Sequence, residues 1–269
     1  MPELPEIRHL ACQMNGALSG KVFAGADILN PKCLNMGADE FVRALSGRAV
    51  VSATSLGKWV FLSLDGGSRL ALNLNMGGNV VLYGPGLGPR EKWRVNLKFT
   101  DGCSLSIGFW FLGYLHFIAP GQPHPMTDGL GADPLAPDFT FEAFDALLGR
   151  RKLTIKALLL RQDVIAGIGN YYIQDMLFLA RVHPMKSVAA LDAEERRRVY
   201  DAMRSYLQKA LDLGGASYEN DLYDQPGAYK EMLIGYKEGQ PCPQCGSAIR
   251  KIKTGSTSGF ICEGCQPLP

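Results

Sequence analysis

The sequence predicts an α+β multidomain chain: an N-terminal helix with an antiparallel β-sandwich, then a helical domain, then a zinc finger on a C-terminal β-hairpin. Three observations support this fold class. An amphipathic stretch precedes short segments rich in Val, Leu and aromatic residues, helical periodicity follows, and the cysteines gather near the C-terminus. The change from strand-like to helical periodicity, and then to clustered cysteines, therefore marks the boundaries between the domains.

Length and composition describe an ordinary globular chain. Its 269 residues suffice for two domains and a small module. The net charge of +2 does not by itself indicate a nucleic-acid-binding protein, so any basic surface has to be local. The sequence shows neither an apolar run long enough to cross a membrane nor a signal-peptide pattern. We therefore expect a cytoplasmic protein without a membrane partner.

The first domain is expected over residues 1–118. Apolar residues recur within residues 4–18 at the spacing of one helical face, and Gly20 is a suitable stop. Between residues 47 and 118, short runs with partial alternation are separated by glycine-containing turns. Asp101-Gly102 is a typical pair for a tight hairpin. These features predict the β-sandwich.

A proline- and glycine-rich stretch, 119–138, reads as a linker before a helical domain at 139–235. Thr140 is a candidate N-cap, and a long helix is predicted to begin at Asp192. Residues 216–232 are polar and aperiodic, and are predicted to form a mobile functional loop within this domain.

The last segment, 236–269, contains two CxxC pairs separated by sixteen residues. Four thiolates at this spacing close a tetrahedral site around one structural Zn²⁺. The candidate ligands are Cys242, Cys245, Cys262 and Cys265. The alternative is four buried or redox-active cysteines. The odd total of seven cysteines argues against a secreted disulfide framework.

Two segments have the character of phosphate-binding elements. The segment between the CxxC pairs carries three cations, Arg250, Lys251 and Lys253. The sequence GIGN places Gly167 and Gly169 before a helix predicted to begin near Asn170, and a helix N-terminus attracts anions. The alternatives are an ordinary solvated face for the hairpin and a glycine-containing turn between helices for GIGN.

Three motifs together resemble those of one family. PELPEI at the N-terminus, GIGN between helices, and C-x2-C-x16-C-x2-C followed by Gln266 occur in the order found in the Fpg/Nei (formamidopyrimidine-DNA glycosylase / endonuclease VIII) family. The chain resembles a divergent member. The resemblance implies a helix–two-turn–helix DNA-binding domain and a bifunctional DNA glycosylase/AP lyase. It also implies a monomer that acts on damaged double-stranded or partly single-stranded DNA, associated with a bacterial nucleoid.

The resemblance also assigns catalytic roles. After removal of Met1, the amine of Pro2 would attack C1′ of the damaged nucleotide and form an imine, followed by β/δ-elimination. Glu3 would act as the acid and base, and Lys58 would pair with a phosphate beside the lesion. The alternative for Pro2 and Glu3 is a plain helix start, since both residue types favour the first turn.

By the same resemblance, five residues would contact DNA: Met76, Lys156, Asn170, Tyr236 and Lys253. Met76 would fill the gap left by an extruded base, although a core methionine at a strand end is the alternative. Lys156 would lie near the lesion, and Asn170 and Tyr236 would bind phosphates. Loop 216–232 would cap the lesion.

The chain departs from the family pattern where substrates are read. The family's Asp-Pro-Arg-Arg-Phe-Gly is Gly-Phe-Trp-Phe-Leu-Gly at residues 108–113, which loses the arginine that reads the opposite base. Aromatic residues offer stacking surface that tolerates any base, but a buried strand is the alternative. Thr257 stands where the family has an arginine in the zinc finger. Asn73 stands where many members have a histidine, and Asp175 where a glutamate is frequent.

These departures leave the lesion open and support a second hypothesis. The chain would then be a DNA-binding protein that senses abasic or distorted DNA without excising a base. A third hypothesis, a general zinc-ribbon interaction protein, leaves the N-terminal motif unexplained.

Overall fold

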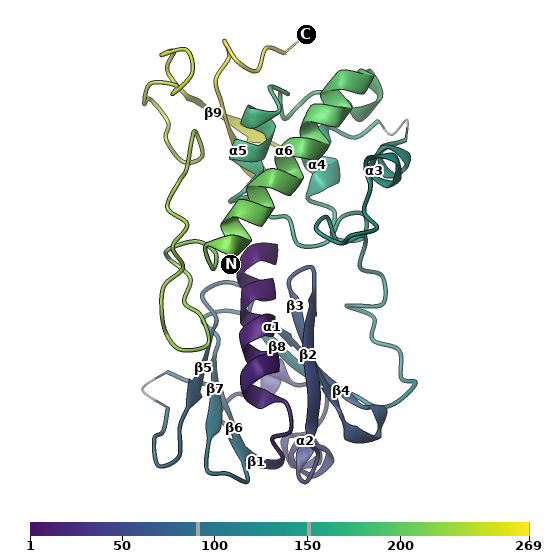
Figure 1. The fold of residues 1–269 in the computed structure, drawn as a ribbon, viewed down its shortest axis with the longest axis vertical. Helices are drawn as coiled ribbons and strands as arrows, with labels where there is room; N and C mark the ends of the chain where they lie inside the picture. The colour runs from purple at the N-terminus through teal and green to yellow at the C-terminus, as the bar shows by residue number, and fades with distance from the viewer. Residues whose placement is uncertain (90–91, 150–151, 269) are drawn as a thin grey trace. The chain divides into compact units, whose positions relative to one another are not determined.

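The computed structural model describes residues 1–89, 92–149 and 152–268. Their contacts form two compact units (Figure 1). The first comprises Met1–Gly129 and Leu213–Tyr229, and the second Leu130–Asp212 and Lys230–Pro269. Residues 213–229 thus group with the first unit, whereas loop 216–232 was expected in the helical domain. Residues 90–91, 150–151 and 269, which fall in the three predicted domains, lie outside the described residues.

Helix α1 (Leu4–Leu18) has the bounds that its periodicity predicts. Glu3 is its N-cap, and the backbone N–H of Glu3 donates to Oε2 of Glu6 at 2.8 Å, as in a capping box. The apolar face of α1 packs against strands β2 (Val50–Leu56) and β3 (Trp59–Leu64) of the first unit. Each fully buried aliphatic side chain on that face contributes about 1.5–3 kcal/mol.

Two four-stranded antiparallel sheets form the body of the first unit, as the alternating segments predict. One sheet has the order β1 (Phe23–Ile28), β6 (Val95–Phe99), β7 (Ser104–Gly108) and β5 (Asn79–Tyr83). The other has the order β2 (Val50–Leu56), β3 (Trp59–Leu64), β4 (Arg69–Asn73) and β8 (Tyr114–Ile118). Side chains of both sheets and of α1 share one hydrophobic core, which also receives Leu222.

Strand β1, helix α2 (Ala38–Leu45) and two 3-10 helices were not predicted from the sequence. The 3-10 helices are η1 (Pro31–Cys33) and η2 (Asp65–Gly67). Helix α2 has eight residues, of which only Phe41 and Leu45 are buried, so it shows too few apolar repeats to be recognised.

The second unit contains helices and a small hairpin. Its elements are α3 (Phe141–Leu148), α4 (Ile155–Leu159), α5 (Ile173–Leu179), η3 (Val188–Ala190), α6 (Ala193–Asp212), β9 (Arg250–Thr254) and β10 (Thr257–Ile261). Thr140 caps α3 as predicted, because its Oγ1 accepts the N–H of Ala143 at 3.3 Å. No helix in the described ranges is long and apolar enough to cross a membrane.

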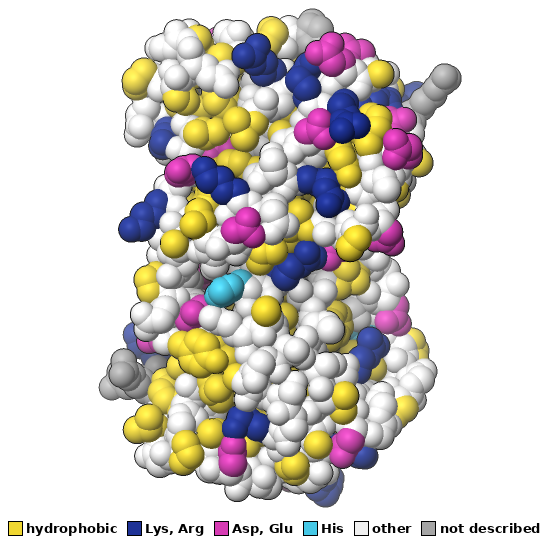
Figure 2. Space-filling model, in the orientation of Figure 1, with side chains coloured by type: hydrophobic (Ala, Val, Ile, Leu, Met, Phe, Trp, Pro, Cys, Tyr) yellow, Lys and Arg dark blue, Asp and Glu magenta, His cyan; other side chains and the backbone are white. Residues whose placement is uncertain are grey.

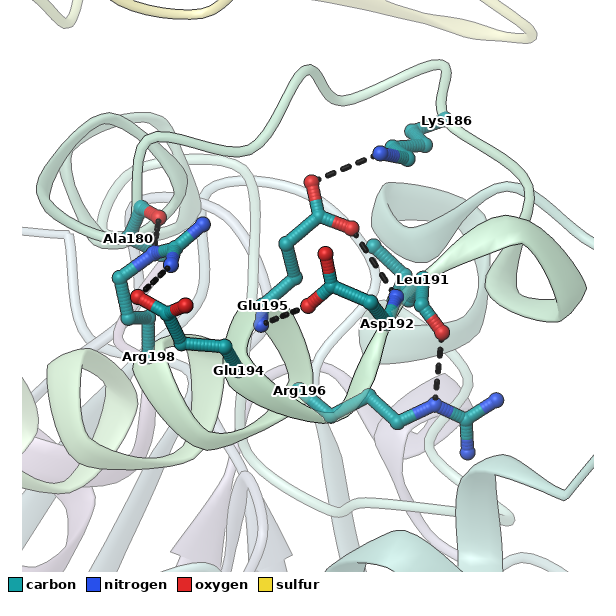
Figure 3. A network of polar contacts seen from close by, with 8 residues as sticks. All are labelled: Ala180, Lys186, Leu191, Asp192, Glu194, Glu195, Arg196 and Arg198. Carbon is teal, nitrogen blue, oxygen red and sulfur yellow. Dashed lines mark hydrogen bonds and ion pairs between the residues drawn. The ribbon is translucent and has the colours of Figure 1, made fainter.

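Helix α6 begins with a reciprocal cap (Figure 3). The N–H of Glu195 donates to Oδ1 of Asp192 at 2.8 Å, and the N–H of Asp192 donates to Oε2 of Glu195 at 3.1 Å. Lys186 pairs with the free oxygen of Glu195 at 2.7 Å, and Arg198 joins Glu194 to the carbonyl of Ala180. This network fixes the start of the longest helix at Ala193, one residue after the predicted Asp192.

Candidate functional site

The N-terminus of the chain lies against a carboxylate from a distant segment. Pro2 is buried, and the amine of Met1 lies 3.2 Å from Oε1 of Glu219. Burial raises the pKa of the Glu219 carboxyl, while the N-terminal ammonium lowers it and Glu6 raises it further. Glu219 therefore holds a proton more readily than a solvated carboxyl does, at the position where the chain begins.

Glu6 connects this N-terminus with the loop of residues 213–229. One of its carboxylate oxygens accepts the N–H of Glu3, and the other accepts the N–H of Ala216 at 2.9 Å. The loop is also held by Gln13, whose Nε2 donates to Asp221 at 2.7 Å. Glu3 itself is buried beside the helix start. Glu219 thus lies beside the amine of Met1, and Glu6 joins Glu3 to the loop.

Lys58 approaches the same carboxylates from the tight turn between β2 and β3. Burial lowers its pKa, and the charges of Glu3 and Glu6 act in the opposite direction. The amide of Asn73 donates to the carbonyl of Lys58 at 3.1 Å and accepts the N–H of Asn75 at 2.9 Å. The structure therefore brings Pro2, Glu3 and Lys58 into one region of the first unit.

An exposed apolar surface lies at the ends of two loops in the first unit. Met76 is 54 % exposed and forms an isolated antiparallel bridge with Phe111, which is 64 % exposed. Trp110 and Leu112 are 81 % and 58 % exposed. We call Met76, Trp110, Phe111 and Leu112 the apolar tip. The buried-strand alternative is wrong for residues 110–112, although Phe109 is buried, and Met76 is not a core residue.

In the second unit, Asn170 and Tyr236 lie together. Nδ2 of Asn170 donates to the Tyr236 hydroxyl at 3.2 Å, and the amide of Gln174 donates to Oδ1 of Asn170 at 3.0 Å. The helix predicted to begin near Asn170 is α5, which begins three residues later, at Ile173, with Tyr172 as its N-cap. Residues 170–172 form a turn instead, so a short turn and side chains, rather than a helix end, shape this surface.

Asp175 fixes the segment that carries Tyr236. Its fully buried carboxylate accepts the Tyr206 hydroxyl at 2.6 Å and three consecutive backbone N–H groups. Those N–H groups belong to Leu233, Ile234 and Gly235, at 2.6, 2.9 and 2.9 Å. Tyr236 follows with φ 58°, a left-handed conformation that non-glycine residues seldom adopt. The buried carboxylate therefore holds the exposed tyrosine in place.

Lys156 anchors the hairpin instead of lying on the surface. It is 1 % exposed, and its ammonium donates to Oγ1 of Thr254 at 2.9 Å and to the carbonyl of Ser258 at 2.5 Å. Burial lowers the pKa of Lys156 to about 8. Thr257 closes the hairpin through a 3.1 Å contact between its hydroxyl and that of Thr254. Lys253 is exposed on β9.

The four cysteines of the C-terminal segment form a metal site. Their Sγ atoms lie within 4.8 Å of one another. Cys242 and Cys265 approach to 3.8 Å, and Cys245 and Cys262 to 3.3 Å. Four Zn–S bonds of about 2.3 Å place tetrahedral sulfur atoms ~3.8 Å apart, so the set fits one structural zinc. All four positions are occupied by protein, which leaves none for a reacting group.

The charges on the surface are mixed. On the face shown in Figure 2, Lys and Arg side chains lie among Asp and Glu side chains and form no continuous basic surface. On this face, any contact with a polyanion would therefore depend on particular side chains.

Sequence reasoning missed three of these residues. Glu6 had a signal, because Glu3 and Glu6 stand at the spacing of a capping box. Glu219 lies in an aperiodic loop, and Asp175 was noted only as a substitution. Neither position carries a local pattern that reveals its partners.

Comparisons with known proteins cover nearly the whole chain. Residues 1–108 match the formamidopyrimidine-DNA glycosylase N-terminal domain, residues 130–221 its H2TH domain, and residues 239–268 a zinc finger found in FPG and IleRS. The formamidopyrimidine-DNA glycosylase of Chloroflexus aurantiacus is 35 % identical, with 99 % of this chain and 98 % of that protein covered. That of Roseiflexus sp. is 34 % identical, with 99 % and 100 % covered.

Solved structures of formamidopyrimidine-DNA glycosylases have the same fold as this chain. The Lactococcus lactis Fpg in complex with abasic-site DNA has a TM-score of 0.90 and 28 % identity, with 99 % of this chain and 100 % of that chain covered. The same enzyme with N7-benzyl-Fapy-dG DNA has a TM-score of 0.91 and 27 % identity, with the same shares covered. The domain order, the fold of each part and the cysteine cluster all agree with these matches, and the chain belongs to the formamidopyrimidine-DNA glycosylase family.

Proposed function

We propose that the protein is a DNA repair glycosylase and AP lyase that uses the amine of Pro2 to form an imine with damaged DNA. One observation carries the proposal: Glu219 lies 3.2 Å from the amine of Met1, the neighbour of Pro2, and Lys58 lies within the electrostatic influence of Glu3 and Glu6. A neutral secondary amine is a nucleophile, and nearby carboxyls of different pKa can donate and accept protons.

The chemistry begins with hydrolysis of the Met1–Pro2 peptide bond, which converts an amide nitrogen into a free amine. Its lone pair bonds to C1′ while the C1′–base bond breaks, and the base leaves with the electron pair of the broken bond and takes a proton from water. Glu3 supplies a proton to the opening sugar ring, and Glu219 accepts the proton of the amine. The resulting iminium loses a C2′ proton and expels the 3′-phosphate. A second elimination expels the 5′-phosphate, and water then releases Pro2.

Separate surfaces contact the DNA in this proposal. The apolar tip enters the base stack where the damaged nucleotide has left it, because apolar side chains replace lost stacking. Asn170, Tyr236 and Lys253 bind phosphates of damaged double-stranded or partly single-stranded DNA. Lys156 acts indirectly by positioning the hairpin. We also propose that the protein acts as a monomer in the cytoplasm, on nucleoid DNA.

Borohydride trapping tests the proposal directly. Protein whose free Pro2 has been verified by mass spectrometry should form a covalent adduct with abasic-site DNA, and peptide mapping should locate it on residue 2. Pro2→Leu, which retains Met1, is the matched control and should lose at least ~90 % of the adduct if proline is the nucleophile. Absence of an adduct with verified free Pro2 would overturn the mechanism.

A panel of oligonucleotides separates this function from DNA sensing without excision. It comprises oxidised purines, oxidised pyrimidines, bulky adducts, crosslinks and abasic sites. Multiple turnover on any damaged base supports the glycosylase. Salt-sensitive binding with no cleavage of any substrate supports the sensor instead.

A further inference from the structure

A cavity of about 380 Å³ lies in the first unit, apart from the residues around Pro2. Its floor is the outward face of β5 and β7, whose alternate side chains enter the core. None of Pro2, Glu3 and Lys58 lines it. The cavity is therefore distinct from the proposed catalytic region.

The indole of Trp110 has a defined position at the edge of this cavity. A Cβ atom built on Gly77 would lie 2.8 Å from Cε3 of that indole, so the ring rests directly on the glycine backbone. Gly77 also has φ 65°, which favours glycine. Trp110 thus belongs to two features at once: it is part of the apolar tip and one wall of the cavity.

The chemistry of the lining suits a nucleotide. Tyr83, Trp93 and Trp110 provide aromatic faces, and stacking on such faces is a main source of base binding. Lys92 and Arg94 provide positive charge for a phosphate. The volume lies within the ~300–1,000 Å³ of ordinary ligand pockets.

Polar groups in and beside the cavity can read a base edge. Asn79, Ser106 and Asp224 lie in its lining. Asn96 stands opposite Ser106 in the strand register, and its buried Oδ1 has no hydrogen-bond partner among the described residues. An outward sheet face with an unsatisfied buried acceptor is unusual for a purely structural surface.

We propose that this cavity receives the unpaired base of the strand opposite the lesion; the identity of the occupant rests on the proposed function. When the apolar tip fills the gap left by the damaged nucleotide, the former partner base loses its pairing. Trp110 joins the tip to the cavity, so a base displaced by the tip meets the cavity next. The carboxylate of Asp224 accepts hydrogen bonds from exocyclic amino groups, and therefore favours cytosine, adenine or guanine over thymine.

Free nucleotides test the cavity without any DNA chemistry. Two of the three tryptophans line it, and the third, Trp59, is 5 % exposed. Titration with dCMP should quench tryptophan fluorescence in a saturable way, with dTMP binding at least tenfold more weakly. Trp93→Leu should weaken dCMP binding at least tenfold, and Asp224→Asn should remove the preference over dTMP. Lys98→Ala, an exposed cation on β6 outside the lining, should change nothing. Quenching that stays linear, or that Trp93→Leu leaves unchanged, would overturn the site.

Photocrosslinking tests the occupant. A duplex with 5-iododeoxycytidine opposite an abasic site should crosslink on irradiation to Trp93 or Tyr83. A crosslink confined to Trp110, Phe111 or Leu112, or none at all, would show that the opposite base stays in the helix. Failure of borohydride trapping would reject the catalytic proposal alone, because neither readout here depends on an imine.

Discussion

The carboxylate of Glu6 accepts the backbone N–H of Ala216 at 2.9 Å, across 210 residues of sequence. Its other oxygen accepts the N–H of Glu3 at 2.8 Å. One side chain therefore fixes both the residue beside Pro2 and the loop of residues 213–229. Removal of the Glu6 carboxylate would break two hydrogen bonds to a charged group, each of which contributes about 1.5–3 kcal/mol to stability.

Glu6→Ala should release this loop and slow excision at least tenfold. Limited proteolysis should show faster cleavage within residues 213–229, and single-turnover kinetics should show the loss of rate. Asp27→Ala is the matched control, because Asp27 is an exposed carboxylate that pairs with Lys98 on the neighbouring strand. Equal protease resistance in wild type and Glu6→Ala would contradict the anchoring role.

Glu219→Gln should change the pH dependence of imine formation. Glu219 acts as a base only when ionised, and its pKa is raised by burial, so wild-type activity should rise with pH through a value above that of a free glutamate. The variant should lose this acid limb and about 10²-fold in rate. Trapping rates measured between pH 4 and pH 8 give the comparison. An unchanged profile would exclude Glu219 as the base.

Lys156 should make the stability of the second unit depend on pH. Its pKa in the folded protein is lowered from 10.5 to about 8, so between these values the unfolded chain binds more protons than the folded chain. The free energy of unfolding should therefore rise with pH across this interval, by up to about 3 kcal/mol relative to Lys156→Met. Urea unfolding of both proteins at pH 7.5, 8.5 and 9.5 with fixed free zinc measures this difference. A constant difference would contradict the lowered pKa.

Removal of zinc should unfold the C-terminal hairpin and spare the first unit. The hairpin buries few side chains of its own, and metal binding then supplies folding free energy. A chelator, or Cys262→Ser, should abolish tight DNA binding while circular dichroism retains the sheet signal. Cys12→Ser, at an exposed cysteine far from the cluster in sequence, should bind zinc and DNA normally. Retention of full DNA affinity without zinc would contradict this.

Trp110→Arg should introduce discrimination between opposite bases. An arginine that bonds a base edge supplies ~1–3 kcal/mol of selectivity, about 5- to 150-fold, whereas an indole stacks on any base. Wild-type excision rates opposite cytosine, adenine and guanine should agree within about threefold by that argument, while Asp224 should lower the rate opposite thymine. Single-turnover assays with the four duplexes measure the excision rate of the wild type and of Trp110→Arg opposite each base. Strong selectivity of the wild type among cytosine, adenine and guanine would show that a residue other than Trp110 and Asp224 reads the opposite base.

Local patterns predicted the regular elements well and the contacts between distant segments poorly. The bounds of α1, the Thr140 cap and the start of α6 follow from periodicity and capping chemistry, which act over a few residues. The zinc ligands follow from spacing alone. By contrast, Glu219 reaches the N-terminus only because a loop is tied down by Glu6 and Gln13. The residues next to Lys156 in the sequence give no sign that it is buried, yet the hairpin nearly a hundred residues later buries it. Such partners are set by tertiary structure.

In the proposed mechanism, the ion pair between the Met1 amine and Glu219 requires that Met1 be removed before the loop of residues 213–229 folds against the N-terminus. An aminopeptidase needs a free, extended N-terminus, but the folded chain buries Pro2 and engages the amine. Glu219 leaves the ribosome only after more than 200 further residues, which takes roughly 10 to 40 s at usual rates of synthesis. During that interval the N-terminus has no carboxylate partner from the loop. In the proposed mechanism, the nascent chain is therefore processed first, and the amine of Pro2 is enclosed afterwards, when the loop arrives.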